Sequence, residues 1–308
     1  MTTVPTDVPD RDPGEVDARA VRRAFGRAAA TYDAAAVLQR EVGSRMGARL
    51  DVVKLAPNTV LDAGCGTGDA LRPLALRYPA ARVVALDLAL PMVTAAQARV
   101  RSGRSLLQRL VLWGGTDSNS TPRFLCGDIN ALPFGAAAFD LVWSNLALQW
   151  VNDLPHAFGE LHRVLRVGGL LTFTTFGPDT LREIRAAFAT VDGYTHTNRF
   201  ADMHDVGDML VHAGFADPVI DMETITLTYG DARSLLQELK QIGATNATRG
   251  RRRGLMGKAR LQRVLAALKG MARDGRIPAT FEVVYGHAWK AEATHTPEGL
   301  PIVRFGQR

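Results

Sequence analysis

A glycine turn preceded by an aspartate is the first group of residues in this chain whose types could bind a small polar ligand. The stretch 59–70 (T-V-L-D-A-G-C-G-T-G-D-A) runs from apolar residues through Asp62 into a turn that contains Gly64 and Gly66. Glycine is required where a turn takes a positive φ or where the backbone must approach a ligand closely. The helix that follows such a turn presents free N–H groups to an anion. By itself, the stretch predicts an anionic or zwitterionic ligand.

Three classes of ligand bind to glycine turns of this kind. A phosphate-binding loop needs the pattern G-x-x-x-x-G-K-[ST], and no lysine follows these glycines. A dinucleotide-binding turn has the pattern G-x-G-x-x-G, whereas the third glycine here comes one residue early. The class that remains is S-adenosylmethionine, which carries a zwitterionic amino-acid end, a sulfonium, a ribose and an adenine.

Two further acids favour this methyl donor. Asp87 ends the apolar stretch R-V-V-A-L-D, and Asp128 follows R-F-L-C-G. Each acid taken alone would more simply cap a helix or a turn. Acids at three successive strand ends, however, are expected where ligands bind outside the carboxyl ends of a parallel sheet. We therefore predict that Asp62 meets the donor's ammonium group, that Asp87 holds both ribose hydroxyls and that Asp128 accepts from the adenine amino group.

The other predicted donor contacts come from residues beside these acids. They are the backbone N–H groups near Gly64 and Gly66 for the carboxylate, Ile129 N–H for a ring nitrogen, and Leu88 and Met92 for the adenine face.

The elements that must position these residues alternate between strand and helix. Strands are predicted at 59–64, 82–87, 123–126, 139–145 and 170–176, with helices between them at about 67–78, 91–101 and 154–165. Such alternation predicts a parallel sheet with helices on both faces. Two later stretches, 225–229 and 281–289, alternate as half-buried antiparallel strands do. The predicted fold class is α/β and resembles the Rossmann-like class I methyltransferase fold, a mostly parallel seven-stranded sheet with a terminal antiparallel hairpin.

We expect a single methyltransferase domain over residues 18–308, preceded by a disordered lead-in at 1–17 that is acidic and rich in proline. The alanine-rich stretch 18–50 is predicted to form an N-terminal cap helix, and 230–278 a helical cap insertion. The stretch 104–121 is predicted to be a further insertion because flexible residues follow a short apolar run.

Composition excludes several classes of protein. No apolar run approaches the ~20 residues that a membrane-spanning helix needs. Two cysteines cannot form a disulfide scaffold and favour a cytoplasmic protein, and the seven histidines lack zinc-type spacing, so no metal is expected. A net charge of +6 favours an acidic partner, which by charge alone is nucleic acid, an anionic membrane or an acidic protein.

Further blocks of sequence resemble the malonyl-[acyl-carrier protein] O-methyltransferases of biotin biosynthesis, from about residue 21 to residue 289. The narrower signals are F-G-R-A-A-A-T-Y at 25–32, N-R-F at 198–200, I-G-A-T-N at 242–246 and A-T-F-E-V-V-Y at 279–285. The resemblance implies methyl transfer from S-adenosylmethionine to the free carboxylate of malonyl-acyl carrier protein or malonyl-CoA. The methyl ester then primes pimeloyl formation.

The resemblance also implies roles for individual residues. Tyr32 is expected to lie over the donor and the substrate, and Asn145 to line the donor pocket. We expect Arg199 to orient the malonyl carboxylate. A carboxylate with a pKa near ~4 is ionised at pH 7, so no general base is expected. The basic segment 249–263 is a candidate docking surface for the acidic carrier protein.

Three alternatives stay open at this stage. The blocks at 150–155 and 177–183 also resemble the methyltransferase-like arginine hydroxylase that assembles complex I. An RNA methyltransferase would share the core, although the basic segment has no interleaved aromatic residues and nucleic acid is not the expected partner. The last alternative is a binding protein with a relic donor site.

Overall fold

The computed structural model describes residues 12, 14–102, 121–252, 254 and 256–292. The strands are β1 (Thr59–Ala63), β2 (Arg82–Asp87), β3 (Arg123–Cys126), β4 (Phe139–Ser144), β5 (Leu165–Phe176), β6 (Ala216–Tyr229) and β7 (Ile277–Trp289). The helices are α1 (Ala18–Ala28), α2 (Tyr32–Ala35), α3 (Val37–Arg49), α4 (Leu71–Arg77), α5 (Leu90–Ser102), α7 (Leu154–Val164), α8 (Arg182–Ala189), α9 (Met203–His212), α10 (Ala232–Gln241) and α11 (Lys258–Gly270). Two short 3-10 helices span Leu50–Val52 and Leu148–Trp150.

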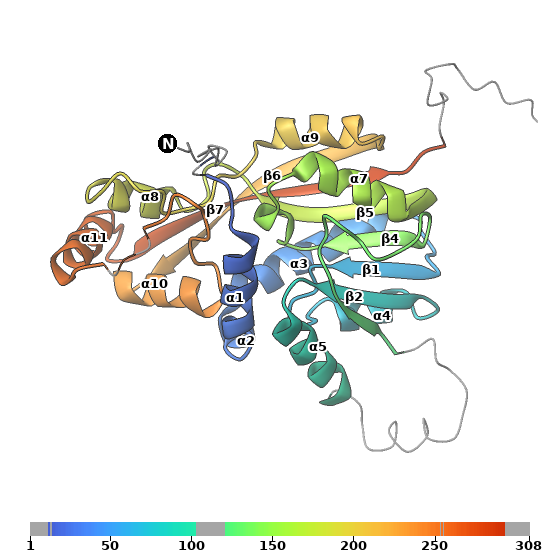
Figure 1. Ribbon diagram of the computed structural model, residues 1–308, viewed down its shortest axis with the longest axis horizontal. Helices are drawn as coiled ribbons and strands as arrows, with labels where there is room; N and C mark the ends of the chain where they lie inside the picture. Colours follow the sequence, from blue (N-terminus) through green and yellow to red (C-terminus); the bar gives the residue numbers. More distant parts are fainter. Residues whose placement is uncertain (1–11, 13, 103–120, 253, 255, 293–308) are drawn as a thin grey trace, which may run out of the picture.

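The strands form one seven-stranded sheet in the order β3-β2-β1-β4-β5-β7-β6 (Figure 1). The first five strands pair in parallel, and β7 runs antiparallel to both β5 and β6. The predicted fold class and its antiparallel pair at the sheet edge are therefore confirmed. Because β1, β2 and β3 are parallel neighbours, the residues that follow their carboxyl ends gather at one edge of the sheet.

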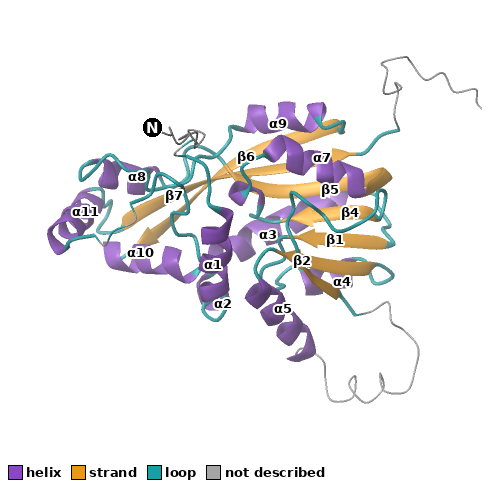
Figure 2. Ribbon diagram, in the orientation of Figure 1, coloured by secondary structure: helices purple, strands orange, loops and turns teal. Residues whose placement is uncertain are grey.

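Helices cover both faces of the sheet (Figure 2). Met46 of α3 and Leu74 of α4 are buried in one hydrophobic cluster with the strands. Phe158 of α7 and Leu210 of α9 are buried in a second cluster. The central strands are apolar on both sides because each side packs against helices, as parallel sheets require.

A two-stranded ribbon carries the helical cap away from the sheet. β7 pairs with β5 only from residue 283 onward, whereas it pairs with β6 back to the Ile277–Tyr229 partners. The chain between those two partners forms α10 and α11, which lie with α8 at one end of the molecule (Figure 1). The cap is thus inserted where a hairpin would have its turn. Asp231 begins α10 as predicted, since its carboxylate accepts hydrogen bonds from the backbone N–H groups of Arg233 and Ser234.

The N-terminal cap consists of three helices instead of one. The helix predicted over 18–50 is interrupted after Ala28 and again at Ala36, whose φ and ψ of −79° and 47° are not helical. Tyr32, the first residue of α2, lies beside the glycine turn, since a Cβ on Gly66 would be 4.0 Å from its Cε1 atom. Before α1, Val16 is buried and bridges to Thr248, although the sequence had placed it in a disordered lead-in. Residues 1–11 of that lead-in lie outside the described residues.

Several predicted boundaries differ from the structure. α4 is shorter than the predicted helix at 67–78, because the glycine turn extends to residue 70. β5 begins at Leu165, earlier than the predicted strand at 170–176, and includes Gly168, which takes a φ of +78°. Helix α9 was not predicted. The predicted insertion at 104–121 lies almost entirely outside the described residues. Within the described ranges, no helix is long and apolar enough to cross a membrane.

Candidate active site

The glycine turn has the backbone that the sequence predicted. Gly64 and Gly66 take φ values of +86° and +53°. A Cβ on Gly64 would lie 2.3 Å from the Cβ of Ala147, so only glycine fits at this approach of the two loops. The N–H of Gly64 donates to the carbonyl of Leu86, and that of Gly66 to the carboxylate of Asp87. Both N–H groups therefore already have partners within the protein. The predicted contact between N–H groups near Gly64 and Gly66 and the donor's carboxylate stays a prediction.

Asp62 is a buried acid that lacks a positive partner within the described chain. Its side chain is 2% exposed, and Oδ2 is buried without a hydrogen-bond donor among the described residues. Burial, reinforced by the negative charges of Asp87 and Asp69, raises the pKa of the Asp62 carboxyl to about 8. A ligand cation placed against Oδ2 would remove that penalty. The site is therefore suited to an ammonium group.

Asp87 lies at the carboxyl end of β2 with its carboxylate held by backbone. Oδ2 accepts from Gly66 N–H at 2.9 Å and Oδ1 from Ala89 N–H at 2.8 Å. These two bonds partly offset the effect of burial, which raises the pKa of Asp87. Each carboxylate oxygen keeps a further lone pair, so the fixed side chain can accept from two neighbouring hydroxyl groups.

A narrow cavity of about 100 Å³ joins Asp87 to the end of β3. Five of the sequence-predicted residues that line it, Asp87, Leu88, Met92, Asp128 and Ile129, come from the ends of β2 and β3 and from α5. Asp128 uses Oδ1 to accept from the N–H of Asn130, which leaves Oδ2 available. Apolar side chains with an acid beside them match the polarity expected for an adenine site.

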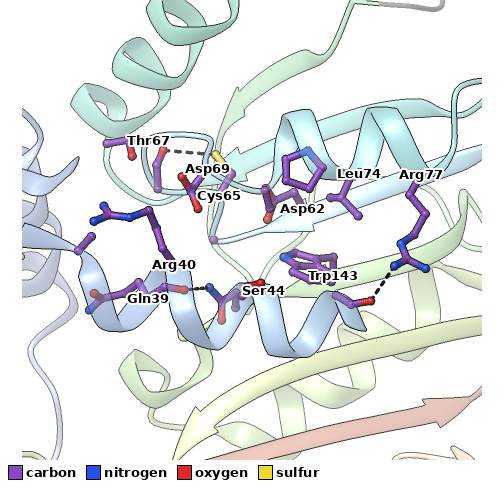
Figure 3. A pocket seen from close by; sticks show the side chains of 18 of the residues that line it. Gln39, Arg40, Ser44, Asp62, Cys65, Thr67, Asp69, Leu74, Arg77 and Trp143 are labelled. Atoms are coloured by element: carbon purple, nitrogen blue, oxygen red, sulfur yellow. Dashed lines mark hydrogen bonds between the residues drawn. The ribbon is translucent and has the colours of Figure 1, made fainter. Parts of the chain in front are cut away.

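A second cavity, of about 650 Å³, lies between α3 and α4 on the other side of Asp62 (Figure 3). Arg40 reaches from α3 toward the glycine turn, with its guanidinium donating to the carbonyl of Asp33 at 2.6 Å. Trp143 lines the same space, and its indole N–H is a buried donor without an acceptor among the described residues. The cavity thus offers a buried acceptor, Asp62, together with a cation and a buried donor. This set is complementary to a zwitterion.

Asn145 lines both of these cavities. Its amide N–H donates to the carbonyl of Gln39 at 2.9 Å, and its carbonyl accepts from the hydroxyl of Thr174 at 2.8 Å. Asn145 therefore fixes α3 against the ends of β4 and β5. One amide N–H remains for a ligand.

Tyr32 lies where these two cavities meet a third one beneath the cap. Its neighbour Asp33 forms a 2.5 Å ion pair with Arg99 of α5, and Arg99 also contacts Asp69 in the glycine turn at 2.8 Å. Thr67 donates to Asp33 as well. These contacts hold α2 against the glycine turn. Burial raises the pKa of the Tyr32 hydroxyl, so the side chain stays neutral.

The third cavity, about 410 Å³, lies between the sheet and the helical cap. Five residues line this third cavity and also one or both of the two cavities described above, which we call the donor cavities. They are Phe25, Tyr32, Gln39, Leu146 and Trp150. The rings of Phe25 and Trp150 pack edge to face, with centroids 5.2 Å apart. Gln149 also lines this cavity, with a buried Oε1 that has no donor among the described residues.

Arg199 is the predicted site residue that the structure does not bring to these cavities. Its side chain is 75% exposed and lies 3.6 Å from the carboxylate of Asp12. It lines a separate surface pocket with residues 192–198. Sequence reasoning missed Arg40.

Comparison with known proteins assigns the family. The model of a family described as a methyltransferase domain matches residues 61–173. The chain is 55% identical to the malonyl-[acyl-carrier protein] O-methyltransferase of Gallionella capsiferriformans, with 94% of this chain and 96% of that protein covered. It is 53% identical to the protein of the same name from a Methylovorus species, with 95% and 96% covered. The chain belongs to the malonyl-[acyl-carrier protein] O-methyltransferase family.

Solved structures support the same fold for this family member. The YcgJ protein of Bacillus subtilis superposes with a TM-score of 0.56 at 15% identity, covering 80% of this chain and 98% of that one. A putative methyltransferase of Bacillus halodurans gives 0.57 at 17% identity, covering 81% and 100%. At such identities the likeness concerns the fold alone. Within the described residues, no group of three or more His, Cys, Asp or Glu side chains is arranged to hold a metal ion.

Proposed function

We propose that this protein transfers a methyl group from S-adenosylmethionine to the free carboxylate of a malonyl thioester on acyl carrier protein. The observation that carries the proposal is the position of Tyr32, which lines two donor cavities and the cavity beneath the cap. Two ligands that enter from opposite sides would meet at this ring. Membership of the malonyl-[acyl-carrier protein] O-methyltransferase family supports the choice of substrate.

The residues present fit the donor at each of its parts. Asp62 would receive the ammonium group, and Arg40 the carboxylate, with Trp143 N–H as a second donor. Asp87 would hold the ribose. The adenine would lie in the narrow cavity, against Leu88 and Met92, with its edge at Asp128 and Ile129. The buried acceptor of Asp62 and the buried donor of Trp143 support this fit, because each lacks a partner among the described residues.

The chemistry needs alignment more than proton transfer. A malonyl carboxylate is ionised at neutral pH, and one of its oxygens attacks the methyl carbon. The O–CH₃ bond forms as the S–CH₃ bond breaks, and S-adenosylhomocysteine leaves with the bonding electrons. Opposite charges disappear in the transition state, so exclusion of water favours the reaction. Tyr32, Phe25 and Trp150 would supply that apolar enclosure.

A cation on the attacking oxygen would oppose this step, because it stabilises the ionised ground state more than the transition state. The donor end of the cap cavity is consistent with that requirement. The residues shared there with the donor cavities are aromatic, aliphatic or, at Gln39, an amide. Gln149, which precedes Trp150 in the sequence and lines the same cavity, has a neutral side chain that can orient the carboxylate.

The ester removes the charge from one end of the malonyl group, which allows fatty-acid synthesis to extend it toward pimelate for biotin. We propose the acyl carrier protein as partner, docked on the basic segment 249–263, and the cytoplasm as the compartment. Cys65 and Cys126 are both free, which fits a reducing compartment.

The deciding experiment is a methylation assay with purified protein, S-adenosylmethionine and malonyl-acyl carrier protein, read by intact-protein mass spectrometry. We expect the carrier to gain one methyl group that a carboxyl esterase removes. Succinyl-acyl carrier protein is the matched control for chain length, and acetyl-acyl carrier protein the control without a carboxylate. Donor binding without any mass gain on malonyl-acyl carrier protein would refute the proposal. Gain of one oxygen on a protein partner would point to an arginine hydroxylase instead.

A further inference from the structure

The cap cavity carries an unusual balance of charge. Its lining, as far as the structure describes it, contains no aspartate or glutamate. The same lining contains three lysine or arginine side chains, Lys240, Arg251 and Arg252. It also contains His196, whose Nε2 lies 2.6 Å from the carboxylate of Asp192. A cavity of this charge is suited to an anionic ligand.

The three cations differ in the partners that they already have within the protein. Arg251 lies 3.3 Å from the carboxylate of Asp17 and also donates to the carbonyl of Thr248 at 2.7 Å. Lys240 is exposed on α10. Arg252 is half-buried, and its Nη1 is a buried donor with no acceptor among the described residues. A buried guanidinium donor without an acceptor is unfavourable unless a ligand supplies one.

Arg252 does not line the donor end of the cavity. The residues that line both the cap cavity and a donor cavity come from the N-terminal cap and the loop after β4, and Arg252 is not among them. A Cβ on Gly254, which is exposed, would lie 3.9 Å from Nε of Arg252. Arg252 therefore lies beside exposed backbone.

The reacting carboxylate must lie beside Tyr32, at the donor end that Arg252 does not line, where a cation on the attacking oxygen would slow the reaction. The anion that meets Arg252 is therefore a different part of the substrate. The acidic side chains of a carrier protein lie on its surface, whereas Nη1 of Arg252 is buried. Apart from the malonyl carboxylate, the thioester arm that enters the cavity carries one anion, the phosphate that joins pantetheine to the protein. We propose that Arg252 binds this phosphate at the entrance of the cap cavity. The guanidinium fork matches phosphate oxygens in a bidentate manner.

This inference rests on the proposed function, because it assumes a malonyl thioester as substrate. It also separates two roles in the cap. Arg252 would give the protein its preference for a phosphorylated arm. The donor end, which has no charged side chain, would instead determine the rate of methyl transfer.

The test compares malonyl-4′-phosphopantetheine with malonyl-pantetheine, which lacks only the phosphate. We expect the unaltered protein to show a KM lower by on the order of 10- to 100-fold for the phosphorylated substrate, with similar kcat. Arg252→Gln should abolish that difference by raising the KM of the phosphorylated substrate alone. Arg252→Lys should retain part of it. Arg233→Gln, an exposed arginine of α10 outside the cavity lining, is the matched control and should keep the full preference.

Equal losses on both substrates in Arg252→Gln would overturn the proposal and indicate a structural role or a contact with the malonyl carboxylate. A preference that survives the substitution would overturn it as well. Calorimetric binding of the two thioesters in the presence of S-adenosylhomocysteine gives the same comparison without turnover. Binding that depends on the phosphate, with no methylation, would refute the proposed function but not this inference. Methylation that does not depend on the phosphate would refute this inference but not the proposed function.

Discussion

The burial of Asp62 predicts that the methyl donor binds with release of a proton. The free protein holds this carboxyl with a pKa of about 8, because burial and two neighbouring acids disfavour its charge. Only the ionised form pairs with the donor's ammonium group. At pH 7 about one molecule in ten has Asp62 ionised, and at pH 6 about one in a hundred. The donor's Kd is therefore expected to rise about tenfold from pH 7 to pH 6.

The same pKa gives a second observable. At pH 7 close to one proton, about 0.9, should leave Asp62 for each donor bound. Isothermal titration calorimetry with S-adenosylhomocysteine, repeated in buffers of different ionisation enthalpy, measures both this number and the Kd. Asp62→Asn keeps the shape of the side chain and removes the titration. It should weaken binding about 10- to 100-fold at pH 8 and leave the remaining affinity independent of pH.

The sign of the effect on stability is also fixed. Because the folded-state pKa of Asp62 lies above its value in the unfolded chain, the native state binds more protons between about pH 4 and pH 8. The contribution of Asp62 to the free energy of unfolding therefore falls as the pH rises through this window. A saturating donor should oppose the fall. A Kd that is constant from pH 6 to pH 7.5, with no proton release, would refute the assignment of Asp62 as the ammonium partner.

Three further substitutions test other parts of the site. Gly64→Ala places a Cβ at 2.3 Å from Ala147 in a backbone of φ +86°, so urea unfolding should show a loss of about 2–5 kcal/mol and calorimetry a loss of donor binding. Tyr32→Phe keeps the enclosing ring and should retain kcat within about threefold. Tyr32→Ala removes the ring and should lower kcat by on the order of 100-fold. Equal losses of kcat in the two variants would assign the role to the hydroxyl. Arg199→Ala should leave both KM values within about twofold, because the side chain is 75% exposed, while a selective rise in the malonyl KM would support the role that the sequence predicted for it.

The sequence was enough to predict that the three acids lie close together, because the carboxyl ends of neighbouring parallel strands meet at one edge of a sheet. Asp62, Asp87 and Asp128 follow strands that are neighbours in a parallel sheet, and all three line the donor cavities. Local patterns cannot show, however, which backbone N–H groups remain free. The amides of Gly64 and Gly66 are used within the turn, and that depends on how β2 ends beside β1.

The residues that sequence reasoning missed or misplaced depend on packing between distant elements. Arg40 lines the same cavity as Asp62 because α3 is held across the ends of β4 and β5 by Asn145. The pattern of apolar residues in α3 does not indicate which of its side chains face the cavity. Arg199 was chosen for its charge and its block, whereas its backbone lies in a loop that turns the side chain toward Asp12. Helix α9 was missed because only Val206 and Leu210 mark its buried side.

The insertion of α10 and α11 between paired residues of one ribbon gives this part of the cap a single point of attachment to the sheet. Tyr229 and Ile277 are Cα partners across β6 and β7, so the whole of 230–276 leaves and re-enters the framework at one place. A tight turn could join those two strands without moving Asp62, Asp87 or Asp128, all of which lie on the far side of β5. Exchange of one contiguous segment can therefore change part of the lining of the cap cavity, while the part contributed by α8 and the N-terminal cap stays in place.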